Sequence, residues 1–321
     1  MTRKTKNKIK ENVIGYILIF PLLISLTIFT IYPLLLSFFQ SFFKDFVINP
    51  NNLKSLSHYD WSSFGLGNYI GAFQDKHFWH AFRITFIYAA VSVPLSIVLS
   101  FIAAYFLSKE FKGAKVFRIL YYLPCLIPGT VCAIIYRYIY AGDAYGFINS
   151  FLYYFHIRDF ATSNGAIQFF ESEIEVVALA SFISLGLFGI GGSSPFWIAG
   201  FKSIPKSYYE AAEIDGISKF RTFFKITIPM MSKYIFFQVI TAFIGAFQIG
   251  QGVLQYSNTG GTNGNLTFLG LIIYNNTTAN SYPPHNIGYA SALSYLLFIV
   301  IAGLTVIFFR YNKFVYYEGD N

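Results

Sequence analysis

Six long apolar segments constrain the fold of this chain more than any other feature of its sequence. A helix needs about 20 mainly apolar residues to cross a bilayer, and each segment reaches that length without containing an Asp or a Glu. The sequence therefore predicts an all-α integral membrane protein with six transmembrane helices. The segments are 13–39, 82–107, 119–140, 176–201, 234–253 and 287–309.

Composition and charge placement agree with this prediction. Of the 321 residues, 55% are hydrophobic and 12% are charged, whereas about 25% are charged in a typical soluble domain. The net charge of +8 does not indicate a nucleic acid partner, because the basic residues cluster beside the apolar segments. Most Lys and Arg lie at the two ends and in the connections 108–118 and 202–233. Since these residues are enriched in cytoplasmic loops, we expect both termini and these connections in the cytoplasm.

The segments divide the chain into three parts. We expect a basic cytoplasmic N-terminus at 1–12, a six-span transmembrane domain at 13–309 and a cytoplasmic C-terminal tail at 310–321. The first segment exceeds the roughly 7–15-residue apolar core of a signal peptide, so we expect it to remain as a span.

The sequence contains no pattern of a catalytic or metal centre. It lacks the phosphate-binding glycine loop, the metalloprotease motif and cysteines paired at zinc spacing, so we expect no catalytic residue, no metal and no cofactor in this chain. Cys125 and Cys132 are predicted on one helix, roughly 10 Å apart along its axis. That separation is too large for a disulfide, and we expect two buried thiols.

Ionisable residues are scarce within the predicted spans. Proton- and ion-driven carriers usually keep such groups at depth, so their scarcity favours a transporter whose energy comes from another chain. Arg83 and Arg137 lie near the outer ends of the second and third segments. A long Arg side chain can extend its charge to the membrane surface, and the alternative is a role at the outer mouth of a pathway.

A segment of mixed charge, 205–229, separates the fourth and fifth apolar segments. Ser207 and Glu210 have the spacing of a capping box, and Gly216 suits the left-handed backbone found at helix C-termini. The pattern predicts a helix over 208–215, a sharp turn and a second helix.

This hairpin has two interpretations. It could be an amphipathic hairpin that anchors the loop at the membrane surface. It could also be a docking surface for a cytoplasmic protein. The small side chains of Ala211 and Ala212 would let another protein approach closely, and Glu210 would place a charge beside them.

The same residues resemble a known motif. Glu210-Ala211-Ala212, followed by Gly216, Ile226 and Ile228-Pro229, resembles the EAA motif of permease subunits of bacterial ATP-binding-cassette (ABC) importers. The family usually has Leu before the proline and Ala where Ile217 stands. The stretches 64–86, 145–152, 257–267 and 287–294 resemble the carbohydrate, MalF-like branch, although the usual TGGGP pattern begins here at Thr259 and reads TGGTN.

The resemblance implies a type I ABC importer permease fold whose 205–229 segment contains the cytoplasmic coupling helix. It implies docking onto an ATPase subunit through Glu210, Ala211, Ala212, Asp215 and Gly216. The implied partners are two ATPase subunits that bind ATP and Mg²⁺, a second permease subunit and an extracytoplasmic solute-binding protein. The implied location is the bacterial plasma membrane and the implied cargo is a sugar or oligosaccharide.

The fourth and fifth spans carry the candidate substrate residues. Glycine and small polar residues there can serve close helix packing or can let a sugar approach the backbone. Phe188 and Phe247 could stack on a sugar ring. The candidate set is Phe188, Gly189, Gly192, Ser193, Gly245 and Gln248.

Two other functions remain open on the sequence. One is an ABC importer permease for a non-sugar solute such as glycerol phosphate, which a basic pocket would favour. The other is a self-sufficient secondary carrier or channel, which would transport without ATP.

Overall fold

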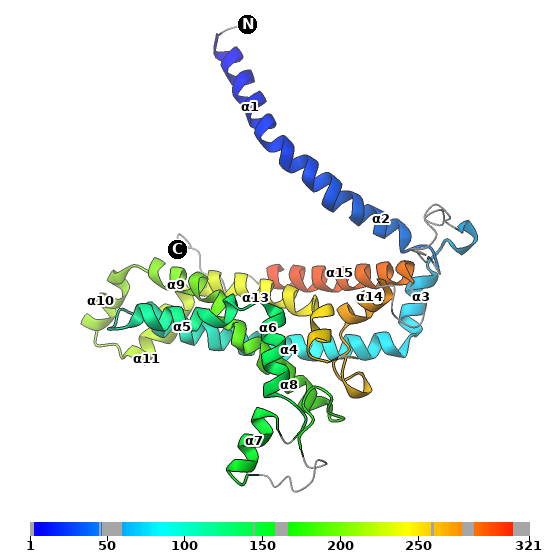
Figure 1. Cartoon of the computed structure of the whole chain (residues 1–321). Helices are drawn as coiled ribbons and strands as arrows, with labels where there is room; N and C mark the ends of the chain where they lie inside the picture. Colours follow the sequence, from blue (N-terminus) through cyan, green and yellow to red (C-terminus); the bar gives the residue numbers. More distant parts are fainter. Residues whose placement is uncertain are drawn as a thin grey trace. The chain divides into compact units, whose positions relative to one another are not determined.

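The computed structural model describes residues 3–44, 46, 60–143, 145–157, 166–257, 260–277 and 286–310. Thr259 and the predicted C-terminal tail beyond Arg310 lie outside them. Within the described residues the chain is mostly helical (Figure 1). It divides into two compact units, Met1–Asp75 with Asn275–Leu296 and Lys76–Tyr274 with Leu297–Asn321, and each is considered by itself.

The first unit begins with a long apolar helix. It runs through α1 (Arg3–Leu26), the π-helix η1 (Thr27–Ile31) and α2 (Tyr32–Gln40). The Thr27 hydroxyl donates to the Leu23 carbonyl at the widened turn, over 2.8 Å. None of the apolar window of the candidate span Ile14–Gln40 is buried, so this helix presents its apolar side chains to its surroundings.

Polar contacts organise the rest of the first unit. It contains η3 (Trp61–Ser63), α3 (Gly67–Gln74) and the start of α15 (Ile287–Arg310). The buried Asn68 amide donates to the backbone carbonyls of Ser41 and Phe43, over 3.0 and 2.9 Å. These bonds satisfy carbonyl groups where the chain leaves α2.

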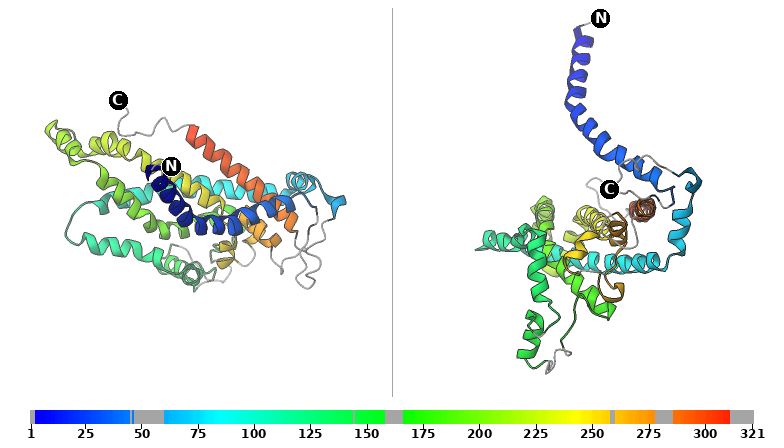
Figure 2. Two further views of the ribbon diagram at one scale, coloured as in Figure 1. Left: turned by 90° about the horizontal axis from the view of Figure 1, so that it is seen from above. Right: turned by 45° about the vertical axis from the view of Figure 1, so that its right-hand side comes forward.

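The second unit is built around α4 (Lys76–Ser108), the longest helix of that unit. In Figures 1 and 2, α4 lies along the fourth span and α13, and both pack against it. The fourth span is continuous through three elements, as the sequence predicts. These elements are α8 (Glu175–Phe188), the 3₁₀ turn η5 (Gly189–Ser193) and α9 (Ser194–Ser203).

The prediction of one straight helix over 119–140 is wrong. The structure has α5 (Ala114–Leu126) and α6 (Gly129–Ile139), bent by 93° at the break between them. Ile127 is extended, with φ −73° and ψ 129°. Pro128 explains the break, because its ring disfavours helical backbone at the preceding residue.

The fifth apolar segment also differs from its prediction. Lys219–Met230 and α13 (Ser232–Phe247) meet at a bend of 65°, and α13 ends before the predicted residue 253. Gly250 has φ −143° and ψ −111°, and a Cβ built on it would lie 2.8 Å from the Gly270 carbonyl oxygen. The backbone of Gly250 therefore packs closely against that of Gly270 in a non-helical conformation, and the helix does not continue through it. The short helix η7 (Gln251–Gln255) follows.

The described residues contain four helices that are long and apolar enough to cross a membrane. The two bent pairs raise the number to as many as six, in agreement with the six predicted spans. The remaining helices outside the 205–229 segment are α7 (Phe147–Tyr154), the turn η8 (Thr262–Gly264) and α14 (Leu269–Thr277).

Candidate functional site

The 205–229 hairpin turns sharply at Gly216. Its first helix, α10 (Lys206–Ile214), ends with φ +66° at Gly216. The Gly216 amide donates to the Glu213 carbonyl over 3.1 Å, and the Ile217 amide donates to the Ala212 carbonyl over 2.9 Å. This pair of bonds is the Schellman arrangement, which satisfies the last carbonyls of a helix. The turn lies where the sequence predicts it.

The second half of the hairpin also follows the predicted order. Ser218 is the N-cap of α11 (Lys219–Thr222), and its hydroxyl accepts a bond from the Arg221 amide. The π-helix η6 (Phe223–Thr227) and α12 (Ile228–Met230) continue the chain to the fifth span. The two helices and the turn form a compact unit between two spans.

The predicted capping box does not form. Helix α10 begins at Lys206, with Pro205 as its N-cap and no side-chain cap. Ser207 therefore lies inside the first turn and cannot cap it. Pro205 has φ −59° and ψ 136°, an extended backbone that leads directly into a helix and moves its start two residues earlier than predicted.

The two alanines of the motif differ in exposure. Ala211 is exposed, whereas Ala212 is only 3% exposed and packs inside the chain. Successive helical residues are turned by about 100°, so only Ala211 of the two lies on the exposed side of α10, and docking of both alanines on a partner stays a prediction. Ile214 is 87% exposed and joins Glu210 and Ala211 on the outer face. The position of Ile214 on the exposed face of α10 makes it a candidate docking residue, which the motif did not indicate.

A polar groove runs along α4 in the second unit. Two adjoining cavities of about 230 and 340 Å³ form it and share Ser96 and Gly186 as lining residues. The polar lining residues of α4 are Tyr88, Ser92, Ser96 and Ser100, beside the apolar Val93 and Ile97. The four polar residues lie four positions apart and therefore on one helix face. Opposite them lie Gly186, Gly189, Gly192, Ser193, Gln238 and Gly245.

The groove brings together some of the candidate substrate residues and not others. Gly189, Gly192, Ser193 and Gly245 line it, whereas Gln248 is an exposed residue at the end of α13 outside that lining. The sequence reasoning missed the serines of α4. Their regular spacing on one helix face was the available signal.

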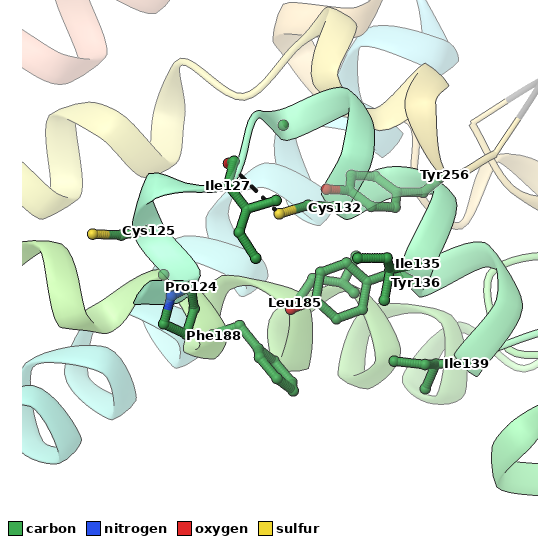
Figure 3. A pocket seen from close by; sticks show the side chains of 12 residues that line it. Pro124, Cys125, Ile127, Cys132, Ile135, Tyr136, Ile139, Leu185, Phe188 and Tyr256 are labelled. Atoms are coloured by element: carbon green, nitrogen blue, oxygen red, sulfur yellow. Dashed lines mark hydrogen bonds between the residues drawn. The ribbon is translucent and has the colours of Figure 1, made fainter. Parts of the chain in front are cut away.

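A separate cavity, of about 450 Å³, lies at the bend between α5 and α6 (Figure 3). Phe188 lines it and packs edge-on against Tyr136, with ring centroids 5.1 Å apart. Cys125 and Cys132 also line it and lie on different helices, one exposed and one half-buried. Two buried thiols on one helix, as the sequence suggested, are therefore not found.

Phe247 is not placed to stack on a ligand. It is 1% exposed and packs edge-on against Phe86, with centroids 6.3 Å apart. The sequence could not distinguish this core aromatic from the half-exposed Phe188.

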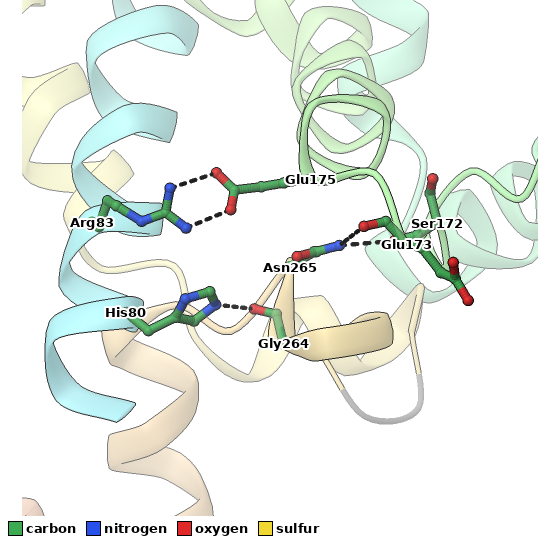
Figure 4. Close-up of polar contacts among 7 residues, drawn as sticks. All are labelled: His80, Arg83, Ser172, Glu173, Glu175, Gly264 and Asn265. Carbon is green, nitrogen blue, oxygen red and sulfur yellow. Dashed lines mark hydrogen bonds and ion pairs between the residues drawn. The ribbon is translucent and has the colours of Figure 1, made fainter. Parts of the chain in front are cut away.

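A cluster of hydrogen bonds and one ion pair joins α4, the residues at the start of α8 and the loop that contains Gly264 and Asn265 (Figure 4). Arg83 forms a two-pronged ion pair with Glu175, including a 3.0 Å bond from Nη1 to Oε1. His80 Nε2 lies 3.0 Å from the Gly264 carbonyl oxygen. Asn265 donates to the Ser172 carbonyl over 2.9 Å. Arg83 thus has a partner in the protein rather than only the membrane surface that its position suggested.

Arg137 is also held by the protein. Its guanidinium donates to the Leu254 carbonyl over 3.3 Å. Arg137 also lines a cavity of about 420 Å³ with Asp143 and Tyr145, and its role at the mouth of a pathway stays a prediction. Among the described residues, no group of His, Cys, Asp and Glu is arranged to hold a metal ion.

These features define a class of protein: a multi-pass helical membrane protein with a helical hairpin between two spans and a groove between helices. Comparison with known proteins identifies the family. A family model described as "Binding-protein-dependent transport system inner membrane component" matches residues 96–315. The chain belongs to this family, and the resemblance to ABC importer permeases is confirmed.

Individual relatives agree over almost the whole length. The "Probable ABC transporter permease protein YesP" of Bacillus subtilis is 31% identical over 99% of this chain and 96% of its own length. The "Trehalose/maltose transport system permease protein MalF" of Thermococcus litoralis is 26% identical over 97% of both chains. A chain of a bacterial ABC transporter involved in import of the acidic polysaccharide alginate has the same fold, with a TM-score of 0.75 and 18% identity over 97% of this chain and all of that one. The type I permease fold is therefore confirmed.

Proposed function

We propose that this permease subunit imports a sugar or oligosaccharide that an extracytoplasmic binding protein delivers. The polar groove carries the proposal. Its lining combines serine hydroxyls, an amide and exposed glycine backbone, and hydroxyl and amide groups pair with the hydroxyls of a sugar. The MalF relative is named for trehalose and maltose transport, which supports the same class of cargo.

The groove also bears on the alternative cargo. A phosphate-bearing solute such as glycerol phosphate is usually held by Arg or Lys. Among the described residues that line the groove there is no Lys, Arg or His. The lining therefore favours a hydroxyl-rich solute over a phosphate.

The energy for import comes from partner ATPase subunits in this proposal. Glu210, Ala211, Asp215 and the exposed Ile214 form the face of the hairpin that meets an ATPase, and Gly216 fixes its angle. ATP and Mg²⁺ bind on those partners, and hydrolysis takes place there. A second permease subunit completes the pathway, and both termini of this chain lie in the cytoplasm of a bacterial cell.

Reconstitution tests this function. The chain is assembled with its partner ATPases, second permease and binding protein in liposomes, and uptake of labelled di- and trisaccharides is measured with and without ATP. We expect ATP-dependent sugar uptake that glycerol 3-phosphate does not inhibit. ATP-independent uptake by the chain alone would instead support a secondary carrier.

Ser96 provides a test of the groove itself. Its hydroxyl donates to the Val93 carbonyl over 2.9 Å, which leaves its oxygen free to accept from a sugar. Ser96→Ala should raise the half-saturating sugar concentration by about 2- to 10-fold, the value of one hydrogen bond. Ser294→Ala is the matched control, because Ser294 is also half-buried and bonds its own helix, at Ala290. Equal effects in both variants would show that Ser96 does not bind the sugar.

A further inference from the structure

A row of packed rings joins the polar groove to the 205–229 hairpin. We call it the aromatic bridge, and it consists of Phe101, Tyr105, Trp197, Phe201 and Phe223. We propose that the aromatic bridge transmits movement of the hairpin to the groove, so that its members act as positioning residues for transport. This inference rests on the function proposed above.

The hairpin end of the bridge is fixed by one hydrogen bond and one short helix. The Tyr209 hydroxyl, on α10, lies 3.2 Å from Thr227 Oγ1, and Thr227 is fully buried. Burial raises the pKa of Tyr209 above its usual value, so its hydroxyl remains protonated in this contact. Thr227 and Phe223 are the two ends of the π-helix η6, a rare element often found at functional sites. A displacement of α10 therefore reaches Phe223 directly.

The middle of the bridge passes from η6 into α4. The Phe223 ring packs on Tyr105 at a centroid distance of 4.8 Å and on Phe101 at 6.1 Å. Phe201 of α9 contacts both α4 rings, at 5.0 Å from Phe101 and 5.6 Å from Tyr105. Phe101 and Phe201 are buried, whereas Tyr105 and Phe223 are half-buried. Because protein interiors are packed as densely as organic crystals, a displacement of Phe223 that reaches the buried pair is passed on rather than absorbed.

The groove end of the bridge is a hydrogen bond to a lining residue. Trp197 is 0% exposed and packs edge-on against Phe101, with centroids 5.2 Å apart. Its indole N–H donates to Ser100 Oγ over 3.0 Å, and Ser100 Oγ donates to the Ile97 carbonyl over 3.1 Å. A serine hydroxyl has one donor and two acceptor sites, so one acceptor of Ser100 remains for a ligand.

The direction of that acceptor depends on Trp197. Ser100 lines the larger of the two cavities of the groove, together with Ser96 and Gln238. If the bridge shifts with the hairpin, the bond from Trp197 lengthens or bends and the Ser100 hydroxyl is reoriented. The grip on a sugar hydroxyl would then differ between the two states of the transporter.

The first test separates coupling from ordinary packing. In the reconstituted complex, Phe101→Leu should reduce the stimulation of ATP hydrolysis by the sugar-loaded binding protein by about 10-fold, within the range of typical allosteric coupling. Unstimulated hydrolysis and the amount of assembled complex should stay at the wild-type level. Phe78→Leu is the matched control, because Phe78 is on the same helix and is 5% exposed against 7% for Phe101. It should leave stimulation unchanged.

The second test addresses the groove end and does not depend on the first variant folding. Trp197→Phe keeps an aromatic ring and removes the N–H donor to Ser100. It should raise the half-saturating sugar concentration for uptake several-fold and leave the maximal stimulated hydrolysis unchanged.

Four results would overturn the proposal. Equal losses in Phe101→Leu and Phe78→Leu would reduce the bridge to core packing. An unchanged half-saturating concentration in Trp197→Phe would remove its link to the groove. Wild-type stimulation and sugar uptake in Phe101→Leu would reject the bridge while leaving the proposed function intact, whereas a wild-type complex that the binding protein does not stimulate would reject both.

Discussion

At the scale of single residues, the angle of the hairpin depends on one backbone conformation. Gly216 adopts φ +66°, and a Cβ built there would meet no atom within 4 Å. A side chain would therefore fit sterically, and its cost is conformational. For residues other than glycine this region costs roughly 1–2 kcal/mol, with Asn and Asp the best tolerated.

Gly216→Val should abolish uptake, because a β-branched residue shifts the turn away from positive φ and changes the angle of α10. Gly216→Asn is the matched control and should retain most of the activity. Membrane insertion of both variants, measured as the amount of chain in the membrane fraction, should equal that of the wild type. Wild-type uptake in Gly216→Val would indicate that the hairpin is only a surface anchor.

At the scale of elements, the contact between the third and fourth spans depends on a second glycine. η5 packs against α5, and a Cβ built on Gly191 would lie 2.1 Å from the Tyr121 carbonyl oxygen. The nearby Gly189 has no atom within 4 Å of such a Cβ. Only one of the two positions therefore needs glycine for packing, although both lie in the same short turn.

Gly191→Ala should destabilise the protein by about 1–3 kcal/mol, the usual cost of overpacking. The obstacle is backbone, which cannot move aside as a flexible side chain can. Gly189→Ala should leave stability unchanged. The fraction of monodisperse detergent-solubilised protein that survives heating measures both variants, and equal melting temperatures would show that α5 and η5 can separate at little cost.

At the scale of the whole molecule, the number of crossings decides on which side each connection lies. Four long helices and two bent pairs can give six spans, and an even number returns both termini to one side. If α5 and α6, bent by 93°, instead entered and left by the same face, the number would be odd. The positive-inside rule favours six crossings, since the basic connections alternate with poorly charged ones.

Alkaline phosphatase fusions test the number of crossings. The reporter needs an oxidising compartment to form its disulfides, so a fusion after Tyr145 should be active and fusions after Gly216 and Arg310 should be inactive. An inactive fusion after Tyr145 would show that the α5–α6 pair does not cross. A fusion after Lys115 is the cytoplasmic control.

The sequence by itself determined the membrane class, the six apolar segments and the turn at Gly216. These features depend on bilayer thickness and on local backbone chemistry, which short stretches of sequence carry. Only the tertiary structure decided that Ala212 is buried while Ala211 is exposed, that Phe247 is core while Phe188 lines a cavity, and that the α4 serines face the glycines of η5. Each of these depends on the rotation of a helix about its own axis, which is set by contacts between residues far apart in the chain.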